Sequence, residues 1–220
     1  MDIRLILVEA FVILFAITVH EAAHAWMANR LGDPTAAALG RASLNPLVHI
    51  DLFGTIILPA ILIFISVKTG GRSPVFGWAK PVPYNPRNLR HPRKDALWIS
   101  FAGPIANILT AVAAALLYQG LKLAHLRIPD PARFNSPVIA LVIILETMVS
   151  INMFLAVFNL IPIPPLDGSG ILAGFLSERA AARFDRIRPY SLFILILLIY
   201  LRIFDILFVP VRFVINWLLS

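Results

Sequence analysis

The sequence contains no cysteine, and charged residues make up only 14% of its 220 positions. The lack of cysteine excludes disulfide bonds and thiol catalysis. Soluble domains are about one quarter charged, whereas this chain is 59% hydrophobic. That composition excludes a disordered chain, a coiled coil and an ordinary soluble enzyme. The long apolar runs do not alternate as the strands of a transmembrane β-barrel do, so the sequence predicts an all-α polytopic membrane protein.

About five to six membrane segments are expected, since each needs about 20 apolar residues. The apolar runs are residues 3–27, 52–67, 96–123, 138–160 and 190–203, followed by a tail at 204–220. The tail is either a sixth short span or an interfacial helix, and we favour the interfacial helix. All segments are expected in a single domain, residues 1–220, with a core at 1–185 and C-terminal membrane segments at 186–220.

Lysine and arginine predict how the segments are oriented. Residues 68–94 carry seven of them and the loop after residue 160 carries four, and loops rich in these residues face the cytoplasm. The net charge of +7 is therefore a topology signal, and we expect no nucleic-acid partner. The 138–160 segment should end at the cytoplasmic face. The 3–27 segment should begin outside the cell.

One consequence concerns the 52–67 segment, which would then begin and end on the cytoplasmic side. We expect it to dip into the membrane without crossing it. Residues 70–82 should return as an extended strand, a small membrane-associated β element covered by protein. Cysteine accessibility across positions 65–85 would test this expectation.

The strongest chemical signal is His20-Glu21-Ala22-Ala23-His24, which matches H-E-x-x-H. Positions i and i+4 of a helix lie on one face, so both imidazoles can reach one metal ion. Glu21 can hold a water molecule and take its proton. The alternative is that these are buried core residues, but ionisable groups are costly inside a membrane and usually functional there.

A catalytic zinc site usually has three protein ligands. The candidates for the third ligand are His49, Asp51, Glu146 and Asp167. We favour Asp167, because it follows a proline-rich stop at 162–165 and precedes a glycine that lets the backbone approach closely. The alternative is that Asp167 is the N-cap of the next helix. His49 and Asp51 could equally line a cavity or form a turn.

Several motifs resemble those of the site-2 protease family of intramembrane zinc metalloproteases. They are His20-Glu21-x-x-His24, Ala102-Gly103-Pro104-x-x-Asn107 and Asn159-Leu-Ile-Pro-Ile-Pro-Pro-Leu-Asp167-Gly168. Two further stretches resemble its short bacterial and archaeal branch, namely Asn45-Pro46-Leu-Val-His49-Ile-Asp51-Leu-Phe-Gly54-Thr and Gly77-Trp78-Ala-Lys80-Pro81-Val-Pro83-Tyr-Asn85-Pro86. The resemblance covers about residues 19–170.

This resemblance implies one Zn²⁺ per chain, held by His20, His24 and Asp167, with Glu21 as the catalytic base. It also suggests Asn159 as a polar group near the scissile peptide or the oxyanion. The expected substrates are transmembrane helices of other proteins, cut within or beside the bilayer of the cell membrane, with the active site near the cytoplasmic face. Regulated intramembrane proteolysis is the expected role. Residues 76–83 could pair with an unwound substrate as an edge strand.

Two other functions remain open at this point. The chain could be a different membrane H-E-x-x-H peptidase in which Glu146 or Glu178 is the third ligand. It could also be a zinc carrier or an inactive protein that binds membrane helices. The oligomeric state is not predicted.

Overall fold

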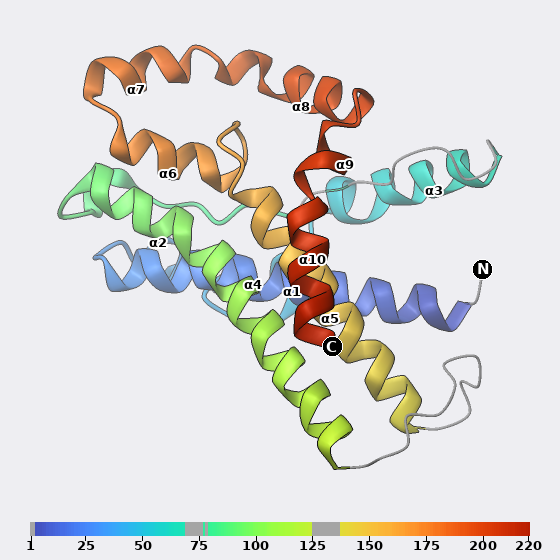
Figure 1. The fold of residues 1–220 in the computed structure, drawn as a ribbon. Coiled ribbons are helices and arrows are strands. Elements are labelled where there is room, and N and C mark those ends of the chain that lie inside the picture. The colour runs from blue at the N-terminus through green and yellow to red at the C-terminus, as the bar shows by residue number, and fades with distance from the viewer. Residues whose placement is uncertain (1–2, 69–76, 78, 125–136) are drawn as a thin grey trace.

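The computed structural model describes residues 3–68, 77, 79–124 and 137–220, and every regular element within these residues is a helix (Figure 1). The helices are α1 (Ile3–Arg30), α2 (Thr35–Ala38), η1 (Pro46–Val48), η2 (Leu52–Ile57), α3 (Leu58–Lys68), η3 (Pro86–Asn88), α4 (Pro92–Leu123), α5 (Pro137–Asn159), α6 (Asp167–Phe175), α7 (Glu178–Asp185), η4 (Arg188–Tyr190), α8 (Ser191–Tyr200), α9 (Ile203–Leu207) and α10 (Val209–Leu219). The predicted all-α class is confirmed for these residues.

Three helices of the described chain, α1, α4 and α5, are long and apolar enough to cross a membrane. They correspond to the predicted segments 3–27, 96–123 and 138–160 and have 28, 32 and 23 residues. At 1.5 Å per residue each exceeds the hydrocarbon thickness of about 30 Å. The chain is therefore compatible with a membrane protein of at least three spans.

The other predicted segments form shorter helices. The 52–67 run forms the π-helix η2 followed by α3, the 190–203 run contains the ten-residue α8, and the tail forms α9 and α10. None of these helices has the length of a full span, so the count of five to six segments stays a prediction. Most of the predicted strand at 70–82 lies outside the described residues, and its described part forms no strand.

Helix α4, which runs diagonally through Figure 1, contacts α1, α5, α6 and α10. Small residues such as Ala111, Ala114 and Ala115 are buried along it and allow close packing of helices. One apolar cluster joins α4, α5 and α10 and includes Val149, Val211 and Ile215. The C-terminal helix thus packs on two of the long helices.

Helix α6 packs against α4 through two glycines one turn apart. A Cβ atom at Gly170 would clash with Oγ of Ser100, and one at Gly174 would lie 2.7 Å from Cβ of Leu97. Small residues spaced by four let two helices approach closely. This contact fixes α6, and therefore also Asp167 at its first position, against α4.

Asp33 ties the loop after α1 to the loop before α4. Its side chain is 0% exposed and accepts hydrogen bonds from Thr35, from the main-chain N–H of Asn85 (2.6 Å) and from Nδ2 of Asn88 (2.7 Å). Burial opposes the charge of Asp33, but the hydrogen bonds from Thr35, Asn88 and Asn85 outweigh it and lower the pKa of the carboxyl. The carboxylate form therefore stabilises this junction.

We expect Asp33→Ala to lower the free energy of unfolding by about 2 kcal/mol or more, because buried donors lose a charged acceptor. The lowered pKa means that this contribution is complete above the unfolded pKa of about 3.9 and is lost as pH falls through the lower folded value. The difference between wild type and variant in thermal melting in detergent should therefore narrow below pH about 4. Asp185→Ala is the control, because Asp185 pairs with Arg188 on the exposed surface and should cost about 0.5 kcal/mol or less. Equal losses for the two variants would contradict the assignment.

Candidate metal centre

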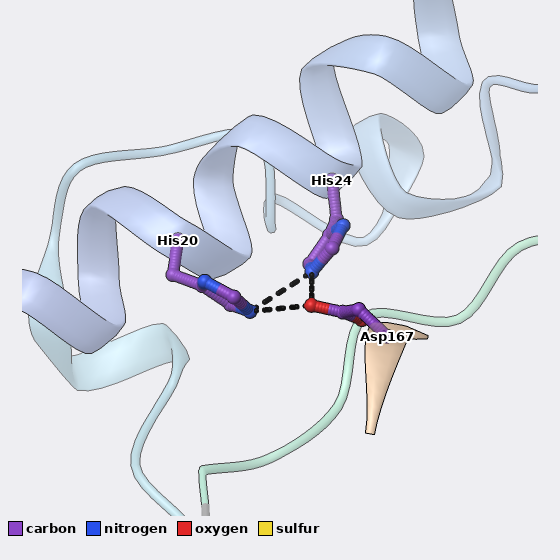
Figure 2. Close-up of side chains that lie close together, drawn as sticks. All are labelled: His20, His24 and Asp167. Carbon is purple, nitrogen blue, oxygen red and sulfur yellow. Dashed lines mark hydrogen bonds and ion pairs between the residues drawn. The ribbon is translucent and has the colours of Figure 1, made fainter. Parts of the chain in front are cut away.

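His20 and His24 lie one turn apart on α1, and Asp167 faces them from the start of α6 (Figure 2). The two histidines are 5% and 8% exposed. Their Nε2 atoms are 3.1 Å apart, and Oδ2 of Asp167 lies 3.0 Å from that of His20 and 3.3 Å from that of His24. Among the described residues, no other group of three histidine, cysteine, aspartate or glutamate side chains brings its ligand atoms together.

The other ring nitrogen of each histidine is held from behind. Nδ1 of His24 lies 2.6 Å from the carbonyl oxygen of Ile99, and Nδ1 of His20 lies 2.6 Å from Oδ1 of Asn107. Both partners on α4 are acceptors, so both Nδ1 atoms donate and each neutral ring presents the lone pair of Nε2. Such hydrogen bonds fix the tautomer and the orientation of histidines that bind metals.

Asn107 connects His20 to a third helix. It is fully buried, and its Nδ2 donates to the carbonyl oxygen of Ala16 (3.0 Å) and to Oδ1 of Asn152 on α5 (2.8 Å). Nδ2 of Asn152 donates in turn to the carbonyl oxygen of Met148. Each polar atom of the Asn107 side chain is therefore used, and α1, α4 and α5 are joined behind the metal ligands.

These donor atoms fit a zinc ion. The buried Oδ2 of Asp167 has no hydrogen-bond donor in the described chain. Two lone pairs and a carboxylate oxygen that face one another repel unless a cation joins them. Ligands 2.0–2.1 Å from a tetrahedral Zn²⁺ are about 3.3 Å apart, close to the 3.0–3.3 Å seen here.

Glycine at position 103 lets α4 lie directly against the imidazoles. A Cβ atom there would be 2.5 Å from Nε2 of His24 and 2.7 Å from Nε2 of His20. The next residue, Pro104, is buried inside α4. The motif that includes these two residues therefore forms the wall of α4 that contacts the metal ligands.

The proline-rich stop after α5 brings Asp167 to the histidines. Helix α5 ends at Asn159 and α6 begins at Asp167. The N-cap position of α6 is Leu166, and no side chain caps the helix, so Asp167 is not the N-cap. A Cβ atom at Gly168 would clash with the carbonyl oxygens of Leu160 and Ile161, which explains the glycine after the aspartate.

A cavity of about 400 Å³ opens on the three ligands. Both Glu21 and Asn159 line it, together with apolar residues from α1 and α5. Oε2 of Glu21 accepts a hydrogen bond from the main-chain N–H of Val82 (3.1 Å), and Nδ2 of Asn159 donates to the carbonyl oxygen of Leu155 (3.0 Å). The five residues singled out as site residues therefore share one cavity.

The other candidate ligands lie elsewhere in the described chain. His49 is buried, and its Nε2 is hydrogen-bonded to the carbonyl oxygen of Ser43. Asp51 caps η2 by accepting a hydrogen bond from the main-chain N–H of Gly54. Neither residue joins the group of three ligands or lines the cavity, and the same holds for Glu146 and Glu178.

Sequence reasoning missed several residues that support the site. Asn152 bonds to Asn107, and Val82 bonds to Glu21. Gly170 and Gly174 let α6 pack closely against α4. The spacing of the two glycines is a recognisable signal for close helix packing. The other two contacts have no local signal, because they depend on which helices and loops meet.

We expect Gly103→Ala to disrupt the metal centre, since the new methyl group would displace both imidazoles. Zinc affinity should fall about 10- to 100-fold, as when groups that orient metal ligands are changed. Gly120→Ala is the matched control on the same helix, because nothing lies within 4 Å of the added Cβ. That variant should bind zinc normally and gain up to about 1 kcal/mol of helix propensity. Competition with a chromogenic chelator measures both, and equal zinc affinities would contradict the close approach.

The chain is similar to known zinc metalloproteases. The sequence model of peptidase family M50 matches residues 8–201. The chain is 33% identical over 187 residues to "Putative zinc metalloprotease YwhC" of Bacillus subtilis, covering 84% of this chain and 77% of that one. It is 29% identical over 188 residues to "Putative zinc metalloprotease Rip2" of Mycolicibacterium smegmatis, covering 84% of this chain and 64% of that one. No solved structure matches. The chain therefore belongs to peptidase family M50, the site-2 protease family that its motifs resemble, and zinc is its cofactor.

Proposed function

We propose that this metalloprotease hydrolyses peptide bonds within or next to transmembrane helices of membrane-protein substrates, in regulated intramembrane proteolysis. The observation that carries the proposal is the convergence of His20, His24 and Asp167 in one cavity that also contains Glu21. Both histidines lie on a helix long enough to span the bilayer. The membrane bilayer and helical substrates are the proposed partners.

Under this proposal His20, His24 and Asp167 hold one zinc ion per chain. When bound there, zinc polarises the scissile carbonyl and lowers the pKa of water toward 7. Asn107 and the Ile99 carbonyl hold the imidazoles in the tautomer that this binding needs. The chain thus supplies two neutral ligands and one anion.

Glu21 is the proposed general base. Its carboxylate takes a proton from the attacking water as the oxygen of that water bonds to the carbonyl carbon. The same proton then passes to the nitrogen of the leaving amine as the C–N bond breaks. Asn159 is the proposed donor to the oxyanion, because its amide has a second N–H besides the one bonded to Leu155.

The proposed substrates are helices that unwind near the cut. A helix has its carbonyl groups in internal hydrogen bonds, so it must unwind before water can attack it. The prolines at 81 and 83 have no N–H, and the N–H of Val82 already donates a hydrogen bond to Glu21. Pairing with a substrate strand would therefore rely on the earlier part of the proposed 76–83 edge, in which residues 76 and 78 lie outside the described residues. We favour substrates with helix-weak residues near the cut.

We also propose a multi-pass arrangement in the cell membrane with the active site near the cytoplasmic face. Five of the seven basic residues of 68–94 precede α4, and Arg93 and Lys94 lie in its first turn, whereas four arginines follow α6 at positions 179–188. The proposal places the first turns of α4 and the start of α6 on the same side.

We expect Glu21→Gln to reduce cleavage about 10²- to 10⁴-fold, because it removes a general base, while one zinc ion per chain is retained. Asp167→Ala should lose zinc as well as cleavage. Glu178→Gln, at the exposed start of α7, is the control and should cleave normally. The assay uses purified protein in detergent with a helix-weakened transmembrane substrate, and metal analysis of each variant. Cleavage by Asp167→Ala would instead favour a different third ligand, and normal cleavage by Glu21→Gln would refute the mechanism.

The cysteine-free sequence allows the topology to be tested with single cysteines. Leu123→Cys, at the end of α4, should react with a membrane-impermeant maleimide in intact cells, whereas Arg87→Cys, in η3, should react only after permeabilisation. Both side chains are exposed, so accessibility from one side decides the outcome. The reverse pattern would place the active site at the outer face.

A further inference from the structure

A stretch of chain that contains none of the metal ligands contacts Glu21. The main-chain N–H of Val82, 61 residues further on, donates a hydrogen bond of 3.1 Å to Oε2 of the Glu21 carboxylate. Residues 79–85 form no helix or strand. Ala79, Pro81 and Val82 line the same cavity as Glu21.

Residues 79–85 are fixed on both sides of Val82. Hydrogen bonds connect them to the loops that follow α1. They include those from the N–H of Lys80 to the carbonyl oxygen of His49 (2.9 Å), from Nη1 of Arg41 to the carbonyl oxygen of Pro81 (2.8 Å) and from the N–H of Asn85 to Oδ2 of Asp33 (2.6 Å). The position of the Val82 N–H is therefore set by the fold and does not depend on a side-chain rotamer.

The residues beside Val82 make this donor distinct. Proline at 81 and 83 carries no N–H, so Val82 provides the only main-chain N–H from residue 81 to residue 83. A hydrogen bond from a main-chain N–H to a carboxylate is charge-assisted and about twice as strong as one between neutral groups. Carboxylate oxygens that lack such a partner rotate freely about the side-chain torsions.

We infer that the Val82 N–H is a positioning group for Glu21. It holds Oε2 and thereby directs the other carboxylate oxygen, Oε1, toward the attacking water. A general base must lie within hydrogen-bond reach of the proton that it takes, so a fixed carboxylate raises the rate of the chemical step. This inference rests on the proposed function, because that function makes Glu21 the base.

Hydrogen exchange tests the bond itself, without substrate. A peptic peptide that spans residues 80–84 contains few exchangeable amides, because two of its five residues are proline. Glu21→Ala removes the acceptor, and Glu21→Gln keeps a side-chain oxygen that can accept. We expect one amide of this peptide to exchange at least about tenfold faster in Glu21→Ala than in Glu21→Gln or wild type. Unchanged exchange in Glu21→Ala would overturn the inference.

Steady-state kinetics tests the effect on catalysis. Val82→Pro removes the N–H, and it keeps the extended backbone that a residue before proline already favours. Val82→Ala keeps the N–H and shortens the side chain. We expect Val82→Pro to lower kcat about 10- to 100-fold, with KM changed by less than about twofold and zinc content unchanged. The kcat of Val82→Ala should stay at least about tenfold above that of Val82→Pro.

Three outcomes would overturn the inference. These are a wild-type kcat in Val82→Pro, a raised kcat in Val82→Pro, which would mean that the segment obstructs the site, and equal losses in both variants. Wild type and Glu21→Gln are measured in the same detergent assay with the same transmembrane substrate. A failure of the proposed function shows in the wild type, whereas a failure of this inference shows in Val82→Pro beside an active wild type. If Val82→Pro is poorly folded, the exchange measurement decides.

Discussion

The fold is organised around three buried metal-ligand atoms whose lone pairs repel one another. The Nε2 atoms of His20 and His24 and Oδ2 of Asp167 lie 3.0–3.3 Å apart at the centre of an apolar helix bundle. A cation removes this repulsion, and without one the surrounding helices must hold the atoms against it. The hydrogen bonds on both Nδ1 atoms, the close approach at Gly103 and the attachment of α6 to α4 all serve to hold them.

Helix α4 transmits this constraint to the rest of the molecule. Successive positions along it contact α6, the imidazole of His24 through the Ile99 carbonyl, both imidazoles at Gly103 and the imidazole of His20 through Asn107. Asn107 also bonds to Asn152, so α5 is included. Polar side chains inside a membrane bundle bond across helices because lipid offers no partner. The metal centre and the helix packing are therefore one structure.

The sequence was sufficient to predict the long helices and the residues that converge in the cavity. Apolar runs longer than 20 residues form helices in a bilayer. The spacing of His20 and His24 puts both side chains on one face of such a helix. The shorter segments were harder to predict. The 190–203 run ends where Arg202 adopts a left-handed φ of 58°, and neither glycine nor proline marks that position. Asp33, Asn152 and Val82 could not be predicted because their partners are set only when distant segments meet.

Prolines explain how irregular backbone can surround a site in an apolar environment. An unpaired main-chain N–H costs several kcal/mol where there is no water, and a proline has none. Between α5 and α6, residues 162, 164 and 165 are proline. The N–H groups of the other residues from 160 to 166 are all bonded, because they donate to the carbonyl oxygens of Ala156, Phe158, Ile161 and Ile163. The same reasoning applies at 81–83, where the single N–H bonds to Glu21. In both segments proline allows irregular backbone without leaving an unpaired donor, so the chain can turn toward the ligands.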